Sequence, residues 1–440
     1  MEGYFTEIAA CLDSSLEDGE MYTCGLEAEV SDFVRMNRGR VRQCGTVAQA
    51  YLELHLIRGK RHAQHRLGVS RNPADDREAV LQALRSLRET VRQVPEDPHL
   101  RVATDVHSSR VQRTATLPAA EDAFAAVLEA GHGLDLVGFY AAGPIYRGFA
   151  NSLGQRNWHE ARTFNLEWSL YHRADKAVKT AYSGFEWSDA ELAARMAGSR
   201  ERLALLSTPS RTLKPGRYRA YLAPPALDEV ATMLCWGGFS GRALQTRQSC
   251  LSRMQDGSAS LSAAVSFAEN TAAGVAPAFQ SEGYTRPERV DLVDRGRLVG
   301  ALVSPRTSRE FALAPNGANA DEVPESLEMG AGDLPAGDVL AALDTGIYVG
   351  NLWYLNFSDR PACRLTGMTR FASFWVERGR IVAPIDVMRF DDSVFRMLGS
   401  NLEALTRDRD LIVNSSTYGS RNLVSMRLPG ALVGEMSFSL

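Results

Sequence analysis

Ser207-Thr-Pro-Ser-Arg-Thr-Leu-Lys-Pro-Gly216 is the stretch that decides how this 440-residue chain divides. Its two prolines, several hydroxyl side chains and closing glycine disfavour both helix and strand, which is typical of a linker. Strand-like and helix-like segments alternate before this stretch, whereas strand-like segments dominate after it. We therefore expect an N-terminal domain over residues 1–208, a linker over residues 209–216 and a C-terminal domain over residues 217–440.

The N-terminal region begins with a predicted strand meander over residues 21–67. Within it, leucines at every second position of residues 52–56 alternate with Glu53 and His55, which is the period of a half-buried strand. Further elements are expected as helices near residues 80–91, 119–130 and 188–206 and as a strand-rich segment over residues 135–182. This alternation predicts an α/β domain.

The C-terminal region opens with a short strand at residues 218–222 and a helix at residues 225–234. The chain after residue 260 is rich in glycine, serine, valine and leucine. Strands are expected at residues 289–293, 298–303, 346–355, 371–377 and 380–384, and helices at residues 335–344 and 394–406. The whole chain is therefore predicted to be α+β, with a mostly antiparallel, β-rich C-terminal domain.

Composition excludes several classes of protein. The 49 basic and 53 acidic residues give a formal charge of −4, so there is no electrostatic reason to expect nucleic acid as a partner. No apolar run approaches the ~18 residues of a membrane helix, and the acidic N-terminus does not resemble a signal peptide. Six scattered cysteines without a C-x-x-C pair indicate reduced thiols. We expect a cytoplasmic protein that binds no membrane.

The histidines are distributed unevenly, because all eight precede residue 173. No histidine-based metal site or acid–base pair can therefore lie wholly within the C-terminal region. His62-x-x-His65 lies among basic residues, which disfavour a bound cation. His159-Glu160 begins like a zinc-peptidase motif, but Thr163 stands where the second histidine would be needed.

Two residues of the C-terminal region are candidate nucleophiles, Cys235 and Ser240. Gly238-Phe-Ser240-Gly241 is similar to a nucleophile elbow, but Arg242 replaces its last glycine. Cys235 stands among apolar neighbours, which favour an inert thiol. The chain also lacks a Walker loop and a G-x-G-x-x-G motif, so no nucleotide cofactor is expected. The residues alone give no catalytic constellation.

A series of short motifs nevertheless follows a recognisable order. In the N-terminal region these are SDFVRMNRGRVRQ (31–43) and GPIYRGFANSLG (143–154). In the C-terminal region they are PGRY (215–218), LAPP (222–225), FSG (239–241), Glu282-Gly283, GIYV (346–349), NFS (356–358), FWVE (374–377) with Gly379, Pro384 and Asp386. In this order and spacing they resemble the TldD/TldE (PmbA) family over nearly the whole chain. The family's Asp-x-Glu-Gly motif lacks its aspartate here, because Gln280 and Ser281 precede Glu282.

The resemblance implies a two-domain fold and dimers. TldD-like subunits carry zinc on His-Glu-x-x-x-His of the first helix of the second domain, together with a cysteine near the C-terminus. The corresponding stretches here are residues 235–240 (CWGGFS) and 415–420 (SSTYGS). One thiol at Cys235 and one hydroxyl at Ser240 do not supply the three protein ligands of a catalytic zinc. The chain is thus identified as TldE-like, a subunit with no metal or other cofactor of its own.

Three hypotheses follow for the function. The first is a TldE-like subunit that pairs with a TldD-like zinc metallopeptidase, the complex hydrolysing amide bonds in unfolded peptides or peptide-derived metabolites. The second is a metal-independent homodimeric hydrolase with Cys235 or Ser240 as nucleophile and His159 or His172 as base. The third is a non-enzymatic binding protein. The departures from the family pattern leave a specialised natural-product pathway open as an alternative to general proteolysis.

Overall fold

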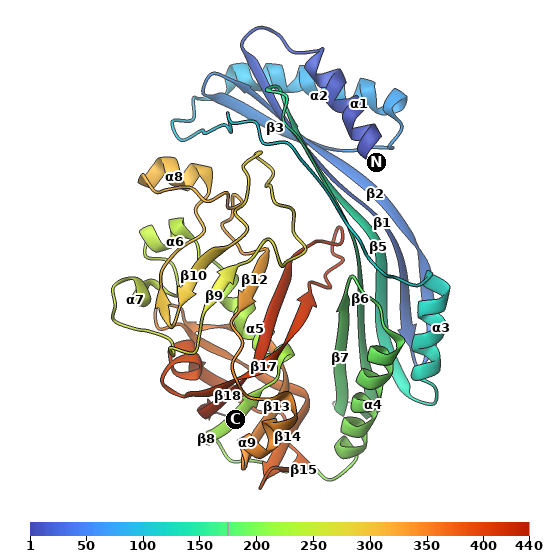
Figure 1. Cartoon of the computed structure of the whole chain (residues 1–440), viewed down its shortest axis with the longest axis vertical. Coiled ribbons are helices and arrows are strands. Elements are labelled where there is room, and N and C mark those ends of the chain that lie inside the picture. Colours follow the sequence, from blue (N-terminus) through green and yellow to red (C-terminus); the bar gives the residue numbers. More distant parts are fainter. Residues whose placement is uncertain (174–175, 440) are drawn as a thin grey trace.

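The computed structural model describes residues 1–173 and 176–439. The strands of this part form one seven-stranded sheet from the N-terminal region and one eleven-stranded sheet from the C-terminal region. In Figure 1 the long strands of the first sheet form a curved wall, and the second sheet with its short helices lies against the concave side. The chain thus combines a helix-and-sheet N-terminal region with a strand-rich C-terminal region, as the sequence predicts.

The first sheet has the order β3-β2-β1-β5-β6-β4, with β7 also paired to β6. Its strands are β1 (Glu20–Asn37), β2 (Arg40–Arg58), β3 (Arg61–Gly68), β4 (Ser109–Arg113), β5 (Asp135–Asn151), β6 (Arg156–Arg173) and β7 (Lys176–Gly184). Arg38 and Gly39 both have positive φ, 52° and 65°, which fits the tight turn between β1 and β2. The predicted meander over residues 21–67 is confirmed.

Four helices cover the two ends of this sheet: α1 (Glu2–Asp13), α2 (Pro73–Gln93), α3 (Ala120–Ala130) and α4 (Asp189–Leu206). Leu52, Leu54 and Leu56 lie on one face of β2 and are buried with residues of α1 and α2. α3 and α4 cover the opposite end (Figure 1). Helix α1 is not among the elements predicted from the sequence, and it packs against α2, β1 and β5.

The second sheet is mostly antiparallel, with parallel pairing of β12 to β18 and of β13 to β8. Its strands are β8 (Gly216–Leu222), β9 (Phe267–Glu269), β10 (Val290–Asp294), β11 (Arg297–Leu298), β12 (Ser326–Met329), β13 (Gly346–Asp359), β14 (Arg364–Glu377), β15 (Arg380–Pro384), β16 (Arg389–Ser393), β17 (Leu402–Val413) and β18 (Ser425–Phe438). The accompanying helical segments are α5 (Pro224–Cys235), α6 (Gly241–Gln245), α7 (Ser252–Gln255), α8 (Pro305–Phe311), η1 (Ala336–Asp338), α9 (Val339–Leu343) and η2 (Arg396–Ser400).

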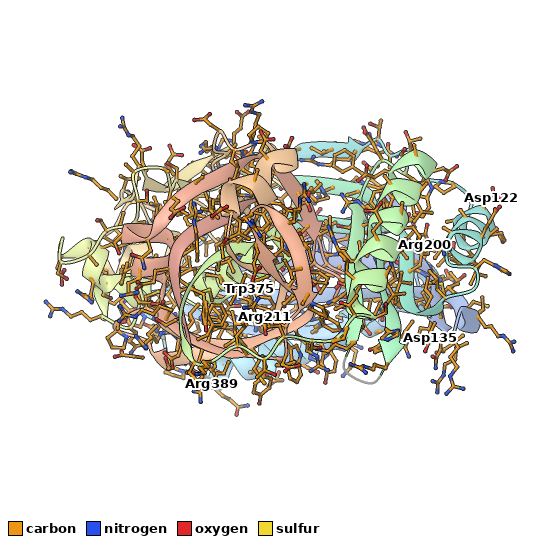
Figure 2. The ribbon with its side chains drawn as sticks, turned by 90° about the horizontal axis from the view of Figure 1, so that it is seen from below. Asp122, Asp135, Arg200, Arg211, Trp375 and Arg389 are labelled. Carbon is orange, nitrogen blue, oxygen red and sulfur yellow. The ribbon has the colours of Figure 1, made fainter. Side chains whose placement is uncertain are left out.

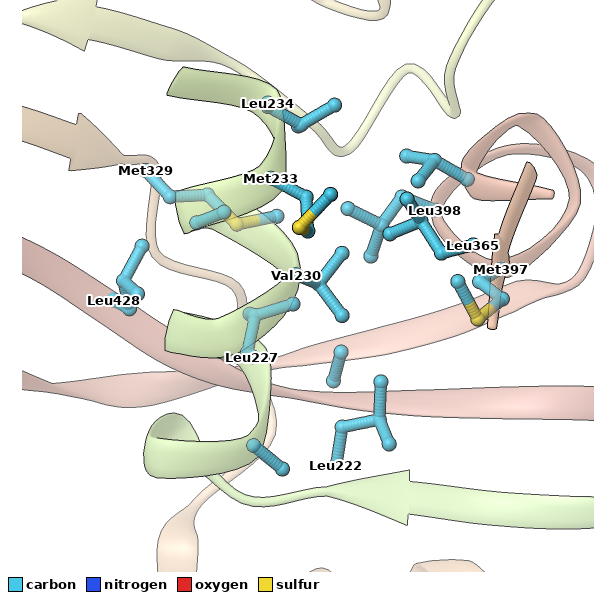
Figure 3. Packing of buried hydrophobic residues seen from close by; sticks show 14 of the residues in the cluster. Leu222, Leu227, Val230, Met233, Leu234, Met329, Leu365, Met397, Leu398 and Leu428 are labelled. Atoms are coloured by element: carbon cyan, nitrogen blue, oxygen red, sulfur yellow. The ribbon is translucent and has the colours of Figure 1, made fainter. Parts of the chain in front are cut away.

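The helix α5 lies at the centre of the C-terminal core. Leu227, Val230 and Leu234 recur on one of its faces and are fully buried in the largest apolar cluster of the molecule. Figure 3 shows this face packed against residues from β8, β12, β14, η2 and β18. Because this apolar face is buried in the core, the opposite face of α5 is directed toward the first sheet.

Two sequence predictions in the C-terminal region are wrong. The helix expected at residues 394–406 is a short turn, η2, followed by the strand β17. The strand expected at residues 298–303 ends almost at once, because β11 spans only Arg297–Leu298. Among the described residues, no helix is both long enough and apolar enough to span a membrane.

The predicted linker packs against the second sheet. Arg211 donates its backbone N–H to Pro384 O at 2.7 Å, and its guanidinium lies 4.9 Å from the ring centroid of Trp375. Figure 2 shows these two side chains next to one another. Its Nη1 also donates to Glu377 Oε1 at 2.5 Å. The placement of the boundary at residues 209–216 remains a prediction.

Candidate functional site

A cleft lies where the first sheet meets the second. It consists of two adjoining cavities of about 410 and 310 Å³, which share the charged residues Glu167, Lys179, Asp228 and Glu229. Strands β6 and β7 and helix α4 line it from the N-terminal region, and α5, β13 and β17 line it from the C-terminal region. We call this space the central cleft and take it as the candidate site.

The start of α5 explains why its polar residues reach the central cleft. Pro224 and Pro225 occupy the first turn, where a missing N–H and a fixed φ favour helix initiation. The helical period then places Asp228, Glu229 and Thr232 on the side that lines the cleft. The sequence therefore directs carboxyl groups, and no histidine, toward the space between the sheets.

Burial shifts the acid–base behaviour of the cleft carboxyls. Burial, reinforced by the charge of neighbouring Glu229, raises the pKa of Asp228 to about 7. Burial also raises the pKa values of Glu229 and of Asp410, which lies on β17. Asp228 is therefore partly protonated near neutral pH, so it can both donate and accept a proton.

The N-terminal wall of the cleft is basic, in contrast to the acidic C-terminal wall. Lys179 Nζ lies 3.7 Å from Glu167 Oε2. Arg195 is held by Glu191 and by the carbonyl of Ala181. Arg202, also on α4, lines the cleft with its guanidinium 6.0 Å from the ring centroid of Tyr348. Opposite charges thus face one another across the cleft.

Two sheet edges border the cleft. In the part of the chain that the structure describes, β7 pairs only with β6, and β17 pairs with β18 and otherwise only through a bridge between Thr406 and Leu334, outside the cleft. Both strands contribute lining residues, and Val413 N donates to Ser183 Oγ at 3.0 Å where the two strands approach. An unpaired strand edge can accept an extended peptide through main-chain hydrogen bonds. Along the central cleft, both strands therefore present main-chain groups without a strand partner.

The two predicted nucleophiles lie in structural settings. Cys235 ends α5 and is buried in the core cluster, where burial raises the pKa of its thiol and disfavours the thiolate. Ser240 caps α6: its Oγ accepts from Ala243 N at 3.0 Å and donates to Glu322 Oε2 at 2.6 Å. Neither residue lines the central cleft.

The two histidines considered as bases are also separated from the cleft. His159 is buried on β6, with Nε2 3.1 Å from Val275 O, and burial lowers its pKa to about 4. It therefore stays neutral and links the first sheet to the C-terminal region. His172 is exposed near the end of β6. Neither histidine is among the residues that line the two cavities.

The residues present do not fit a catalytic metal. Over residues 1–173 and 176–439, no group of three or more histidine, cysteine, aspartate or glutamate side chains is disposed to hold a metal ion. A catalytic zinc needs three such ligands and an open position.

Comparison with known proteins places the chain in a family. Residues 215–440, just over half of it, match the model of the PmbA/TldA metallopeptidase C-terminal domain. The chain belongs to the PmbA/TldD family. The match begins at residue 215, next to the start of β8, and includes the whole second sheet. No curated protein matches the chain.

Solved structures of similar fold cover the chain from end to end. TldE from Thermococcus kodakarensis superposes with a TM-score of 0.80 at 12% identity, covering 99% of this chain and 100% of that one. A candidate modulator of a DNA gyrase from Thermotoga maritima gives 0.75 at 15% identity, covering 100% of both chains. A second candidate gyrase modulator, from Bacteroides thetaiotaomicron, gives 0.76 at 16%, covering 100% and 99%. Identities this low show a shared fold. They extend the PmbA/TldD likeness to the N-terminal region.

The charged residues of the central cleft are not among the site residues predicted from the sequence. Asp228 and Glu229 follow two prolines at a predicted helix start, where acidic residues are commonplace because they stabilise the helix dipole. Lys179 and Glu167 lie on strands whose pairing brings them opposite α5 only in the folded chain. The one feature of the sequence that could have indicated these four residues is that each is a charged residue within a largely apolar segment.

Proposed function

We propose that this chain is the non-metal, TldE-like subunit of a heterodimer with a TldD-like zinc metallopeptidase. The complex would hydrolyse amide bonds in unfolded peptides or peptide-derived metabolites. The observation that carries the proposal is the cleft face of α5, which presents Asp228, Glu229 and Thr232 and no histidine. The zinc and its activated water would come from the partner, and this chain would bind and orient substrate.

The cleft supports a peptide as the substrate. Its two unpaired strand edges suit an extended backbone, and its opposing charges suit a chain that carries both ammonium and carboxylate groups. A third, more open cavity of about 590 Å³ also includes Glu167 and Lys179 and extends the cleft along the first sheet toward Arg35. This continuity supports a substrate longer than a dipeptide.

The test compares three preparations: this chain alone, the TldD-like subunit alone and the two expressed together. We expect a one-to-one complex with zinc and peptide hydrolysis only when the TldD-like subunit is present, and faster hydrolysis in the complex. Zinc at one equivalent in this chain alone, together with peptidase activity, would contradict the proposal. A lack of any complex between the two chains would also contradict it.

A matched pair of variants tests the role assigned to the cleft. Lys179→Met removes the cleft ammonium, and we expect it to raise KM for peptide in the complex by about tenfold, since a charge-assisted contact contributes ~1.5 kcal/mol. Lys60→Met, at an exposed turn outside the cleft, should leave KM unchanged. Equal effects of the two substitutions would argue against substrate binding in the central cleft.

A metal-independent homodimeric hydrolase is the second candidate. The shifted pKa of Asp228 favours it, because a carboxyl that titrates near 7 is suited to general acid–base catalysis. In that case the lone chain would hydrolyse amides in the presence of a chelator, and Asp228→Asn would abolish the activity. Peptide binding without any hydrolysis, alone or in the complex, would instead support a binding protein. In all cases we place the protein in the cytoplasm.

A further inference from the structure

The β1–β2 hairpin contributes polar side chains without partners to the open cavity of about 590 Å³ that extends the central cleft. We call this space the arginine cavity. The polar lining residues from the hairpin are Arg35, Asn37, Arg42 and Gln43. All four belong to residues 31–43, the first of the ordered sequence motifs. Among the described residues, none of the four side chains has a hydrogen-bond or ion-pair partner.

Strand pairing joins the arginine cavity to the central cleft through one row of side chains. Gln43 lies opposite Arg35, and Arg35 lies opposite Phe139. Phe139 in turn lies opposite Glu167, which also lines the central cleft. Directly opposite residues of antiparallel strands point to the same face of a sheet. Since neighbouring strands lie ~4.8 Å apart, the backbone of Arg35 is about 10 Å from that of Glu167.

A β-bulge adds a second guanidinium to this row. Gln43 lies opposite Arg35, but the next pair along the two strands is Val41 with Met36. Arg42 is therefore the extra residue and has no opposite residue on β1. In a regular strand Arg42 and Gln43 would point to opposite faces, yet both line the arginine cavity. Bulges commonly redirect a side chain beside a functional site, and this one brings Arg42 into the cavity.

The lining of the arginine cavity carries a net positive charge. Its basic residues are Arg35, Arg42 and Lys179. Glu167 is the only carboxylate among the described lining residues, and it is already engaged. Ser415 Oγ donates to its Oε1 at 2.7 Å, and Lys179 Nζ lies 3.7 Å from its Oε2. The two guanidinium groups and the amide groups of the hairpin therefore remain available as N–H donors.

We propose that the arginine cavity binds a carboxylate of the peptide substrate. A guanidinium donates through a planar fork that matches the two oxygens of a carboxylate, and Arg35 and Arg42 each supply such a fork. The amide of Gln43, opposite Arg35, supplies a further N–H donor. This inference rests on the proposed function and deepens it, because it names acidic peptides as the preferred substrates.

The distance along the sheet sets where the carboxylate lies in the peptide. An extended chain rises ~3.4 Å per residue, so a group at Arg35 is about three residues from the part of the peptide at Glu167. An acidic side chain and a C-terminal carboxylate both have the required chemistry. The two sources are therefore compared directly in the binding experiment.

The experiment measures peptide binding to the full chain by isothermal titration calorimetry. The neutral probe is N-acetyl-pentaalanine amide. One anionic probe is the same peptide with a free C-terminal carboxylate, and the other carries glutamate in place of the first alanine. A lysine at that position gives the cationic control. We expect at least one anionic peptide to bind at least about tenfold more tightly than the neutral one, and the lysine peptide to bind no better. The anionic peptide that binds more tightly identifies the source of the carboxylate.

Arginine variants test the site itself. Arg35→Met and Arg42→Met each remove one guanidinium from an exposed position. We expect each to reduce the preference for the anionic peptide to about twofold or less, with unchanged affinity for the neutral peptide. Arg40→Met is the matched control, because Arg40 is exposed on the same strand and does not line the arginine cavity. It should keep the full preference.

The inference would be overturned if the neutral, anionic and cationic peptides bound equally well, or if no peptide bound. It would also be overturned if Arg40→Met lost the preference as completely as the other two variants. A failure of the proposed function looks different, because it is judged from complex formation, zinc content and hydrolysis. Equal binding of all peptides together with hydrolysis by the heterodimer would remove only the carboxylate site.

Discussion

At the scale of single residues, Ser240 shows how a functional motif and a structural cap can look alike in sequence. Its hydroxyl satisfies one N–H at the start of α6 and one oxygen of buried Glu322, which also accepts from Arg242 N and Ser304 N. Ser240→Ala removes the cap and one hydrogen bond to a carboxylate. We expect a loss of about 2 kcal/mol in the free energy of unfolding, measured by urea denaturation.

The comparison for Ser240 is Ser86→Ala, at an exposed position of α2, which should change stability by less than ~0.5 kcal/mol. Peptide hydrolysis by the complex should persist in both variants at temperatures where they remain folded. If the Ser240→Ala protein were folded but had lost all hydrolysis, this result would support Ser240 as a nucleophile.

Asp228 should make stability depend on pH. Its folded-state pKa is about 7, above the ~3.9 of an unfolded aspartate, so its contribution is complete below about pH 4 and is lost as pH rises through 7. Asp228→Asn removes this titration. Between about pH 5 and pH 9 we expect the wild type to lose on the order of 2 kcal/mol relative to the variant.

Urea unfolding at several pH values measures this difference. Asp135→Asn provides the control, because Asp135 is exposed and lies outside the central cleft (Figure 2). Parallel pH profiles for the wild type and Asp228→Asn would show that Asp228 is ionised throughout.

Single site residues were also the feature that the sequence predicted least well. Thiol and hydroxyl residues stood out because they match known nucleophile motifs, yet Cys235 and Ser240 are buried in the packing of α5 and α6. Asp228 acquires its shifted pKa from the covering of α5 by the first sheet. That environment depends on contacts between segments far apart in the chain, which no local pattern encodes.

At the scale of elements, hairpins with a clear turn were predictable, whereas a strand that follows apolar residues with helical spacing was not. The β1–β2 and β14–β15 hairpins have turn residues with positive φ, including Gly39 and Gly379, and both were predicted. Apolar residues at 394–398 have helical spacing, but Gly399 takes non-helical angles and ends the turn. Residues 402–413 then pair with β18, a partner that begins twelve residues later. Pairing overrides the local preference.

The segment between β17 and β18 is fastened to the first sheet by Arg421. This side chain is buried, and its guanidinium donates to Ser31 Oγ at 3.1 Å, to Gly143 O at 3.3 Å and to Thr163 O at 2.8 Å. It therefore joins β1, β5 and β6 to one loop. Neighbouring Tyr418 is fully exposed, which makes it a reporter of how tightly the loop is held.

Arg421→Met should release this segment. The substitution leaves buried acceptors unpaired, so we expect a loss of about 3 kcal/mol in stability and faster chymotrypsin cleavage after Tyr418. Arg407→Met is the control, since Arg407 is exposed on β17 and donates to the carbonyl of Asp333. Unchanged cleavage in Arg421→Met would mean that other contacts hold the loop.

At the scale of the whole molecule, the two sheets are joined by buried contacts along much of their boundary. Gln155 Nε2 donates to Gly283 O at 2.8 Å, Asn165 Nδ2 donates to Val413 O at 2.9 Å, and Lys176 Nζ donates to Ile385 O at 3.0 Å. Apolar clusters also span the boundary, one of them formed by Ile145, Ala161, Val275, Val413 and Leu423. The linker thus marks a change of sheet without a gap in packing.

This packing predicts that the two regions unfold together. Interfaces between domains usually permit independent motion unless they are large and apolar, and this one buries both apolar side chains and polar groups that need partners across it. We expect a single calorimetric transition with equal van't Hoff and calorimetric enthalpies. A chain cut to residues 1–208 should aggregate, because Ile145 and Ala161 would lose their cover. Two separate transitions, or a soluble and cooperatively folded fragment, would show that the regions are independent units.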